Sequence, residues 1–580
     1  MRETIKQWLD HSLAELRAAG VLTATVTPQV TLAKHKAHGD YTSNLALMLA
    51  EQAGIDARDI AAQIIAHLPP SAALEKAETA GPGFINFYLK EDAEHGTFAA
   101  LLAEIAERGE SYGGGWVTGK PRVLVEFVSA NPTGPLHVGH GRGAAYGETL
   151  SALLEVGGYE VEREYYVNDA GRQIDILAVS VWLRYLELGG EEFEFPPVGY
   201  RGDYVWDVAA ELRRTRAATL HYAIGEVSAG LPAGDDEQRM DGLIANCRRL
   251  LGADYRAVVD TAVGALLKNI RADLESFGVH YTKWFSEREL IASGEIEEAI
   301  SILAGKGHLY SKDGATWFRS SAFGDEKDRV VKRADGRMTY FASDIAYHLN
   351  KFRRGYDLIV NVWGADHHGY LPRLRAAVEA LGLDGNKMRT VLVQFANLYR
   401  DGVKVQMSTR GGEFITLREL REEVGCDATR FFYVMRKFSQ HMDFDVTLAK
   451  SQSNDNPVYY VQYAHARICN VFRELESRRL DFSPSSVAVA QLTQAHEQAL
   501  IKRLSQYRDV LKDATEETSP QLLLGFLREL AAEFHSYYNH STFLVDDSDV
   551  RNARLVLITA VRQLLANGLG LLGVSAPQRM

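Results

Sequence analysis

The chain of 580 residues is poor in cysteine, in long apolar runs and in positive charge. Its 3 cysteines lie far apart, so they build neither a disulfide framework nor a Cys-x-x-Cys metal site, which fits a reducing cytoplasm. The longest apolar stretches, such as 555–561 and 569–574, fall well short of the roughly 18 residues that cross a bilayer. With 64 Lys+Arg against 76 Asp+Glu, the net charge is −12, which by itself argues against a polyanionic partner.

The chain also lacks internal repeats and low-complexity segments, which excludes solenoids, propellers and disordered proteins. Hydrophobic residues make up 46% and charged residues 24%, the balance of a chain with large buried cores. The first apolar pattern, with helical spacing from Ile5 to Leu16, carries Glu3, Asp10 and Glu15, and these acids argue against a targeting peptide. The length predicts about three or four domains.

Three sections of the chain differ in pattern. In residues 1–112 an amphipathic helix is followed by β-like runs, the last of which, 81–89, alternates apolar and polar residues and predicts a strand. Residues 116–450 contain short, nearly continuous apolar runs separated by helical patterns, which predicts a parallel α/β sheet. From residue 451 to 580 only helical patterns remain.

Within the middle section, three apolar runs predict buried strands and one stretch interrupts the alternation of strands and helices. The strands are predicted at 122–128, 357–363 and 390–395, and a helix is predicted at 258–274. The interruption, at about 186–245, predicts an insertion.

The segment 126–143 is rich in chemistry-bearing residues, because glycines, an Asn-Pro turn and two histidines lie between a predicted buried strand and a good helix former. Loops at the carboxyl ends of parallel strands form ligand sites, and a helix N-terminus there favours phosphate. His137 and His140 could hydrogen-bond phosphate oxygens as a pyrophosphate group leaves. Alternatives are a dinucleotide fingerprint beginning at Gly139, a metal-binding His pair, and a glycine-rich turn with incidental histidines.

This segment resembles the "HIGH" signature of class I aminoacyl-tRNA synthetases, here His137-Val138-Gly139-His140, and its context resembles the arginyl-tRNA synthetase family. Residues 405–412, Val-Gln-Met-Ser-Thr-Arg-Gly-Gly, are similar to the second signature of the class, "KMSKS". They depart from it because Gln406 and Thr409 replace its two lysines. We expect Arg410, or else Lys404, to supply the missing cation near the triphosphate.

The resemblance implies an α/β multidomain protein with a Rossmann-like parallel-sheet catalytic core, an α+β N-terminal added domain and an all-α C-terminal anticodon-binding domain. The added domain would cover residues 1–112 and contact the tRNA elbow. The catalytic domain would cover 116–450, with the KMSKS-like loop at 404–412, and the anticodon-binding domain would cover 451–580.

The resemblance also implies ATP-dependent attachment of L-arginine to its tRNA through an arginyl-adenylate, releasing pyrophosphate and AMP. Catalysis would involve His137, His140, Arg410 and Lys404. ATP would contact Pro132, Gly134, His137, Gly139, His140, Met407 and Ser408. Arginine, whose guanidinium needs fixed carboxylates, would contact Glu126, Ser129, Asn131, Tyr340, Asp344, Glu287, Asp366 and His368. The tRNA would contact Tyr41, Asn44, Tyr463 and Arg467.

The expected partners are tRNA for arginine, L-arginine and ATP, with Mg²⁺ carried by ATP and no structural metal. We expect a cytoplasmic monomer with no membrane association. Residues 451–580 contain 13 Lys+Arg and 14 Asp+Glu, so most of the net −12 lies elsewhere and an RNA partner remains compatible with the acidic chain.

Three other classes of protein remain open from the sequence. A nicotinamide oxidoreductase would place Glu160, Glu162 or Glu164 on a ribose. A small-metabolite nucleotidylyltransferase would share the histidine chemistry but would not need a helical tail of this length. A non-catalytic RNA-binding paralogue would have lost a histidine or Asp344, both of which are present.

Overall fold

The computed structural model describes residues 2–23, 26–33, 38–405, 414–484 and 489–580. The chain divides into two compact units. The first contains Met1–Tyr112, Glu474–Ser505 and Tyr537–Val561. The second contains Gly113–Arg473, Gln506–Ser536 and Arg562–Met580.

The first unit begins with a small α+β fold. An antiparallel sheet of order β1-β2-β4-β3 packs its apolar residues against three helices. The strands are β1 (Val30–Leu32), β2 (Tyr41–Ser43), β3 (Leu74–Ala80) and β4 (Phe84–Leu89); the helices are α1 (Arg2–Ala18), α2 (Leu45–Ala53) and α3 (Ala57–Ala66). Helix α1 buries Ile5, Leu9 and Leu13, and β4 buries Ile85 and Phe87, so the predicted helix and strand are both confirmed.

The second unit is built on a five-stranded parallel sheet of order β12-β11-β5-β6-β7. The strands are β5 (Arg122–Phe127), β6 (Glu160–Val167), β7 (Lys283–Ser286), β11 (Leu358–Gly364) and β12 (Met388–Val393). The three predicted strands are therefore confirmed as β5, β11 and β12. After β5 the chain builds one half of the sheet through β6 and β7, then returns to the other side of β5 through β11 and β12.

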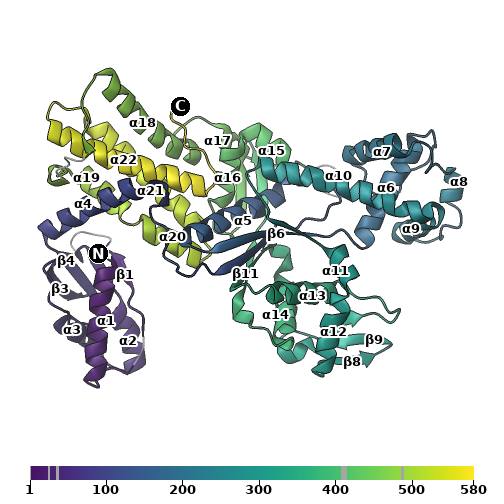
Figure 1. Ribbon diagram of the computed structural model, residues 1–580, viewed down its shortest axis with the longest axis horizontal. Helices are drawn as coiled ribbons and strands as arrows, with labels where there is room; N and C mark the ends of the chain where they lie inside the picture. The colour runs from purple at the N-terminus through teal and green to yellow at the C-terminus, as the bar shows by residue number, and fades with distance from the viewer. Residues whose placement is uncertain (1, 24–25, 34–37, 406–413, 485–488) are drawn as a thin grey trace. The chain divides into compact units, whose positions relative to one another are not determined.

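Helices connect the strands of this sheet (Figure 1). They are α5 (Val138–Gly157), α6 (Arg172–Glu187), α10 (Tyr255–Ser276), α11 (Glu287–Ser293), α12 (Glu295–Gly305), α13 (Tyr340–Arg353) and α14 (Leu371–Ala380). Helix α10 confirms the helix predicted at 258–274. Two three-stranded sheets accompany them: β8 (Leu309–Lys312), β9 (Ala315–Phe318) and β10 (Arg329–Lys332), then β13 (Ala396–Arg400), β14 (Val403–Lys404) and β15 (Met442–Asp445).

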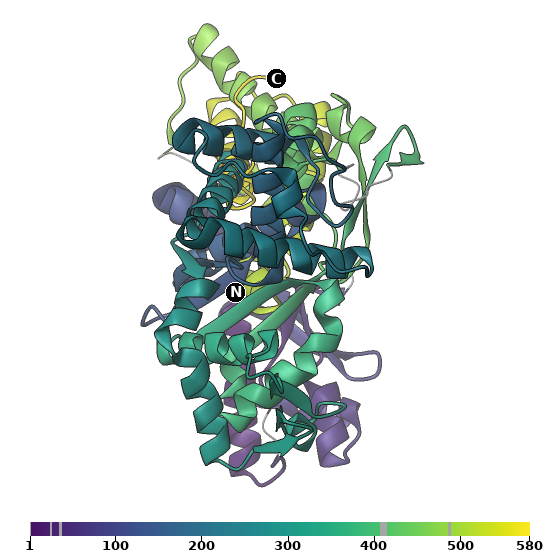
Figure 2. The same cartoon turned by 90° about the vertical axis from the view of Figure 1, so that its right-hand side faces the viewer.

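Where the sequence interrupts its strand–helix alternation, the structure has a helical cluster between α6 and α10. It contains α7 (Asp203–Arg216), α8 (Ile224–Val227) and α9 (Asp236–Leu251). These helices share a hydrophobic core with α6 and α10 that includes the fully buried Trp182 and Tyr185. They face the viewer in Figure 2.

The described residues after Ser451 contain helices and no strand, as predicted. They form α18 (Pro457–Ser477), α19 (Ala495–Leu504), α20 (Tyr507–Glu516), α21 (Gln521–His540) and α22 (Ser548–Leu571). By length and composition alone α22 could cross a membrane, and 56% of its most apolar window is buried inside the protein, as in a core helix. The remaining helices are α4 (Glu91–Arg108), α15 (Leu417–Val424), α16 (Cys426–Val434) and α17 (Val446–Lys450).

One buried arginine joins the start of α5 to the loops around it. The Arg142 guanidinium is 1% exposed and donates hydrogen bonds of 2.7 to 3.4 Å to the carbonyls of four residues: Gln394, Arg436, Lys437 and Gln440. Burial lowers its pKa to about 10, so the side chain remains charged at neutral pH. The first turns of α5 are thereby fixed to the segments after β12 and α16.

We expect Arg142→Met to lower the free energy of unfolding of this unit by about 3–5 kcal/mol, because four buried carbonyls lose a charged donor. Chemical denaturation followed by tryptophan fluorescence measures the change. Arg400→Met, which removes an ion pair of 2.5 Å between Arg400 and Glu423 at the surface, is the control and should cost less than about 1 kcal/mol. Equal effects of the two substitutions would contradict the assignment.

Candidate active site

A cavity of about 600 Å³ lies at the carboxyl ends of the parallel strands. The sheet reverses its order between β5 and β11, and such a switch point opens a crevice outside the strand ends, where α/β proteins bind ligands. The cavity is lined by Val128, Ser129, Ala130, Asn131, His137, Gly139, His140, Gly143, Tyr166, Asn168, Glu287, Tyr340, Asp344, Val362, Trp363, Gly364, Asp366, His367, Val393 and Phe395. Most of these residues follow a strand or begin a helix.

The two predicted histidines lie together at the start of α5. The Gly139 N–H donates to His137 Nδ1 over 3.1 Å, and the His137 N–H donates to His140 Nδ1 over 3.3 Å. The two rings stack with their centroids 3.7 Å apart. Because each Nδ1 accepts a hydrogen bond, the proton of each neutral ring resides on Nε2, which is left as a donor.

Both histidines are neutral at physiological pH. Burial lowers the pKa of His137, and burial together with the adjacent His137 ring lowers the pKa of His140 to about 3. Neutral rings at a helix N-terminus present N–H donors to an anionic ligand, and the helix dipole adds a partial positive charge there.

The segment after the KMSKS-like residues returns to this histidine pair. The Val138 N–H donates to the Ile415 carbonyl over 3.2 Å, and the Leu417 N–H donates to the Leu136 carbonyl over 2.8 Å. The Phe414 ring lies edge-on to His137. Lys404 lies exposed on β14 and does not line the cavity. Three further predicted residues, Met407, Ser408 and Arg410, lie outside the described residues.

Two carboxylates in the cavity have no cationic partner among the described ion pairs. Asp344, on the first turns of α13, accepts a hydrogen bond from the Tyr370 hydroxyl, and burial raises its pKa to about 6. Glu287, at the start of α11, is 4% exposed, and its Oε2 has no hydrogen-bond partner among the described residues. Burial and the neighbouring Asp344 and Asp169 raise the pKa of Glu287 to about 7. Such a pocket of buried acids favours a cationic ligand.

Glu126 lies behind the cavity wall instead of lining it. Its Oε2 accepts a hydrogen bond from Lys351 Nζ over 2.6 Å, and its Oε1 accepts one from Ser129 Oγ over 2.8 Å. The turn between them has Val128 at φ 67° and Ser129 at φ 45°, a left-handed conformation that costs on the order of 1–3 kcal/mol per residue. Ser129 and Asn131 themselves face the cavity.

The remaining predicted residues divide between the cavity and its surroundings. Tyr340, which is 60% exposed, and Asp366 both line it. His368, Pro132 and Gly134 are not among its lining residues. The predictions missed Tyr166, Asn168, Trp363, His367 and Phe395. All five lie at or shortly after the carboxyl ends of strands β6, β11 and β12. A search of the ends of the predicted strands would have found Trp363, His367 and Phe395, because β11 and β12 were predicted and β6 was not.

Three comparisons with known proteins bear on this site. A family model for the catalytic domain of class I tRNA synthetases (R) matches residues 104–189 and 261–442. The N-terminal domain of arginyl tRNA synthetase matches 3–89, and the DALR anticodon binding domain matches 461–580. An arginine–tRNA ligase of Thioalkalivibrio sulfidiphilus is 54% identical over the full length of both chains, and one of Halorhodospira halophila is 53% identical over the full length.

The chain belongs to the arginyl-tRNA synthetase family. The solved arginyl-tRNA synthetase of Thermus thermophilus shares the fold across 100% of both chains, with a TM-score of 0.75 at 22% identity. The helical cluster α7–α9 falls in the gap between the two stretches that the catalytic-domain model matches.

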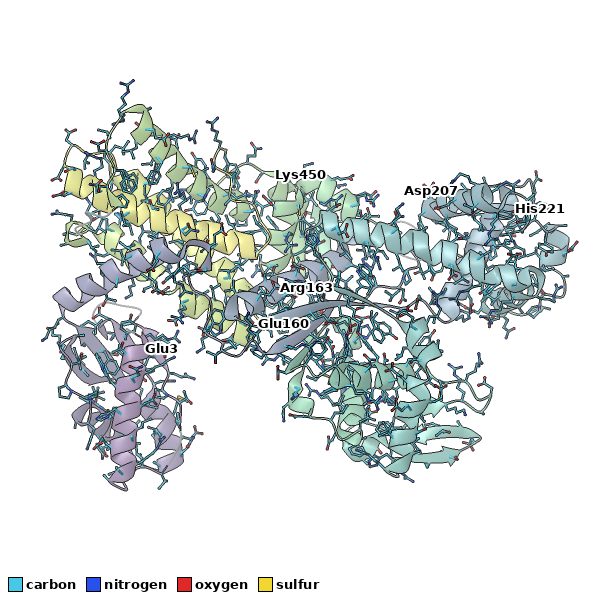
Figure 3. The ribbon with its side chains drawn as sticks, in the orientation of Figure 1. Glu3, Glu160, Arg163, Asp207, His221 and Lys450 are labelled. Atoms are coloured by element: carbon cyan, nitrogen blue, oxygen red, sulfur yellow. The ribbon has the colours of Figure 1, made fainter. Side chains whose placement is uncertain are left out.

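The acids on β6 argue against a dinucleotide-binding site, which agrees with membership of this family. Such a site would need one of these acids beside a ribose. Glu164 is fully buried and pairs with Arg354 over 2.6 Å, and Glu162 pairs with the same guanidinium over 3.1 Å. Glu160 begins the strand, at its amino end (Figure 3), whereas the cavity lies at the carboxyl ends of the strands. None of the three is placed to bind a ribose in the cavity.

The candidate tRNA-binding residues of this synthetase-family chain occur in both units. In the first unit Tyr41 lies on β2 and packs against the hydrophobic core, and Asn44 precedes α2 without a side-chain cap. In the second unit the Arg467 guanidinium lies 4.5 Å from the centre of the Tyr463 ring, on the same face of α18.

The buried Glu287 gives a prediction for the stability of this family member. Its pKa is about 7 in the folded chain and 4.5 for the ordinary group, so the folded state holds its proton more tightly than the unfolded state. This stabilisation is complete below pH 4.5 and is lost as the pH rises through 7. Glu287→Gln should therefore gain on the order of 2 kcal/mol relative to the parent between pH 5 and pH 8.

Chemical denaturation at the two pH values measures this gain. The control is Glu422→Gln, because the Glu422 side chain is 64% exposed and its removal should leave the pH dependence unchanged. If the difference in free energy of unfolding between Glu287→Gln and the parent does not vary with pH, the Glu287 carboxylate is ionised in the folded protein.

Proposed function

We propose that the chain attaches L-arginine to tRNA in two steps within this cavity. The arginine carboxylate attacks the α-phosphorus of ATP, which gives arginyl-adenylate and pyrophosphate. A ribose hydroxyl of the tRNA terminal adenosine then attacks the adenylate carbonyl and releases AMP. The observation that carries the proposal is the presence, in one cavity, of neutral histidine donors at a helix N-terminus and of carboxylates that have no cationic partner among the described ion pairs.

The histidine side of the cavity would hold ATP. His137 and His140 would donate from Nε2 to phosphate oxygens as negative charge shifts toward pyrophosphate, and the first N–H groups of α5 would add to this stabilisation. Gly139 leaves room for close approach of the nucleotide, and Mg²⁺ would arrive with it. Further ATP contacts would come from Pro132, Gly134, Met407 and Ser408, with Lys404 or Arg410 as the added cation.

The acidic side would hold arginine. Asp344 and Glu287 would take the guanidinium, which is always charged and prefers carboxylates that can accept two hydrogen bonds. Further polar side chains would surround the rest of the amino acid: Ser129, Asn131, Tyr340, Asp366 and His368. The carboxylate of Glu126 would act from behind, through Ser129. No covalent enzyme nucleophile is needed, because binding geometry and charge stabilisation carry both steps.

The flanking sections would bind the tRNA. We propose that residues 1–112 contact its elbow through Tyr41 and Asn44, and that residues 451–580 read the anticodon through Tyr463 and Arg467. Aromatic rings and arginine are the groups on which splayed RNA bases stack. The catalytic section would then span 116–450, with its insertion at about 186–245, and the protein would work as a cytoplasmic monomer.

The decisive experiment is arginine-dependent exchange of labelled pyrophosphate into ATP, with and without tRNA that carries an arginine anticodon. Exchange with arginine and tRNA, and its absence with lysine or citrulline, is the expected result. Lysine brings one point charge, and citrulline brings no charge to compensate Asp344 and Glu287. No exchange in the presence of tRNA would overturn the proposal.

A second prediction separates the two sides of the cavity. Asp344→Asn should raise the KM for arginine roughly 100-fold, because a buried partner of the guanidinium loses its charge, and should leave the KM for ATP nearly unchanged. In the parent, the KM for arginine should rise as the pH falls from 8 to 6, since the pKa values of Glu287 and Asp344 are about 7 and about 6. The cation has fewer ionised partners at the lower pH.

Initial rates of aminoacylation at several arginine and ATP concentrations test these expectations. Asp335→Asn, at an exposed ion pair with Arg337, is the control and should match the parent. An arginine KM that neither Asp344→Asn nor acid changes would remove these carboxylates from the arginine site.

A further inference from the structure

A fully buried lysine lies behind the cavity wall that carries Asp344, and neither step of the proposed reaction requires it. Lys351 is on α13, two turns after Asp344, and is 0% exposed. Its Nζ donates to Glu126 Oε2 over 2.6 Å and to Asn361 Oδ1 over 2.7 Å, and it lies 4.2 Å from the centre of the Tyr347 ring. A charge in this position is costly unless its partners compensate it, so its presence calls for a reason.

The partners of Lys351 lead to the cavity wall. Glu126, held by the lysine through one oxygen, accepts from Ser129 Oγ with the other. Ser129 Oγ in turn accepts from the Tyr166 N–H over 3.1 Å, and Asn168 Nδ2 donates to the Ser129 carbonyl over 3.3 Å. These bonds hold the left-handed turn at Val128 and Ser129, which would otherwise relax to an unstrained conformation.

We propose that Lys351 is a positioning residue for arginine. By neutralising Glu126 from behind, it fixes the strained turn that presents Ser129, and it leaves Asp344 and Glu287 as the carboxylates that take the guanidinium. This inference rests on the proposed function and adds a residue that touches no substrate. It also changes the role predicted for Glu126. The Glu126 carboxylate binds Lys351 and Ser129 and does not contact the amino acid.

The charges around Lys351 make the proposal testable by pH. Glu126 raises the pKa of Asp344 and Lys351 lowers it, so the two charges act on Asp344 in opposite directions. Arg373 also lowers the pKa of Asp344, and Asp344 raises the pKa of Glu287; both Arg373 and Glu287 stay unchanged in every variant. The groups nearest Lys351 apart from Glu126 are compensated or neutral. Glu164 pairs with Arg354 and accepts from the Tyr347 hydroxyl, and His348 is neutral because burial lowers its pKa to about 3. Removing the lysine charge alone therefore leaves Glu126 unopposed and raises the pKa of Asp344, which weakens arginine binding most at low pH.

The test uses the full chain in the exchange and aminoacylation assays, with Lys351→Met, Lys351→Arg, Glu126→Gln and the double variant Lys351→Met/Glu126→Gln. Lys351→Met should raise the KM for arginine about 30-fold or more at pH 7.5 and leave the KM for ATP within about threefold. Its defect should be larger at pH 6.5 than at pH 8.5. Lys351→Arg keeps the charge and should recover most of the affinity.

The double variant is the sharpest measurement, because it removes both charges together. Its arginine KM and pH profile should return to within about fivefold of the parent, a coupling that a double-mutant cycle isolates. Thermal midpoints are measured for every variant, so that loss of folded protein is separated from loss of affinity. The matched control is Arg353→Met/Glu298→Gln, which removes an exposed ion pair of 2.7 Å between α13 and α12 and should leave all kinetic constants unchanged.

Two results would overturn the inference while leaving the proposed function intact. One is a Lys351→Met variant that is folded and has the arginine KM and pH profile of an active parent. The other is a double variant no better than Lys351→Met, together with a Glu126→Gln variant equally defective, because Glu126 would then bind arginine directly. An inactive parent would instead reject the proposed function itself.

Discussion

Buried negative charge without a permanent counter-charge is the constraint on which the arrangement of the cavity depends. Glu287 is buried and Asp344 is half-buried, and neither has a cationic partner among the described ion pairs. Such groups destabilise the folded chain at neutral pH unless a cation arrives. A cation that entered this cavity would offset that cost, so part of its binding energy would come from compensating the two carboxylates.

Hydrogen bonds from neighbouring residues fix the segment that carries Glu287. Asp169 accepts from Ser286 Oγ and from the Arg288 N–H, which fixes the start of α11 and the carboxylate of Glu287. The two histidines that line the same cavity remain neutral donors, so the cavity combines carboxylates that lack a counter-charge with uncharged N–H donors. That combination matches a substrate pair made of a cation and a polyanion.

The sequence predicted the family, the fold class and three of the five strands of the parallel sheet, because the strands β5, β11 and β12 are continuous apolar runs and the HIGH-like segment is specific. It did not predict β6, whose residues include four acids or bases. Arg163 and Glu164 are buried there because each finds a partner outside the strand. Arg163 pairs with Glu148 and Glu155 on the preceding helix α5, and Glu164 pairs with Arg354, 190 residues later in the chain. Ion pairs of this kind leave no periodic signal.

The site was predicted in the same uneven way. Residues within the HIGH-like motif and at the start of α13 reach the cavity, whereas the position of Glu126 depends on Lys351, 225 residues later in the chain. No local pattern connects these two residues. The separation of lining residues from supporting residues required the three-dimensional structure, and the roles of both groups remain predictions.

The hydroxyl of Tyr204, in the first turn of α7, donates to the Thr133 carbonyl over 2.7 Å, just before the histidine pair. A Cβ on Gly134 would lie 3.2 Å from the same hydroxyl, so this contact is tight as well as polar. The helical insertion is thus anchored at one end to the loop that precedes the HIGH-like segment. We expect the helices farther along the insertion to tolerate changes of length and sequence over evolution. The first turn of α7 should tolerate fewer changes, since moving Tyr204 would displace the loop that precedes His137.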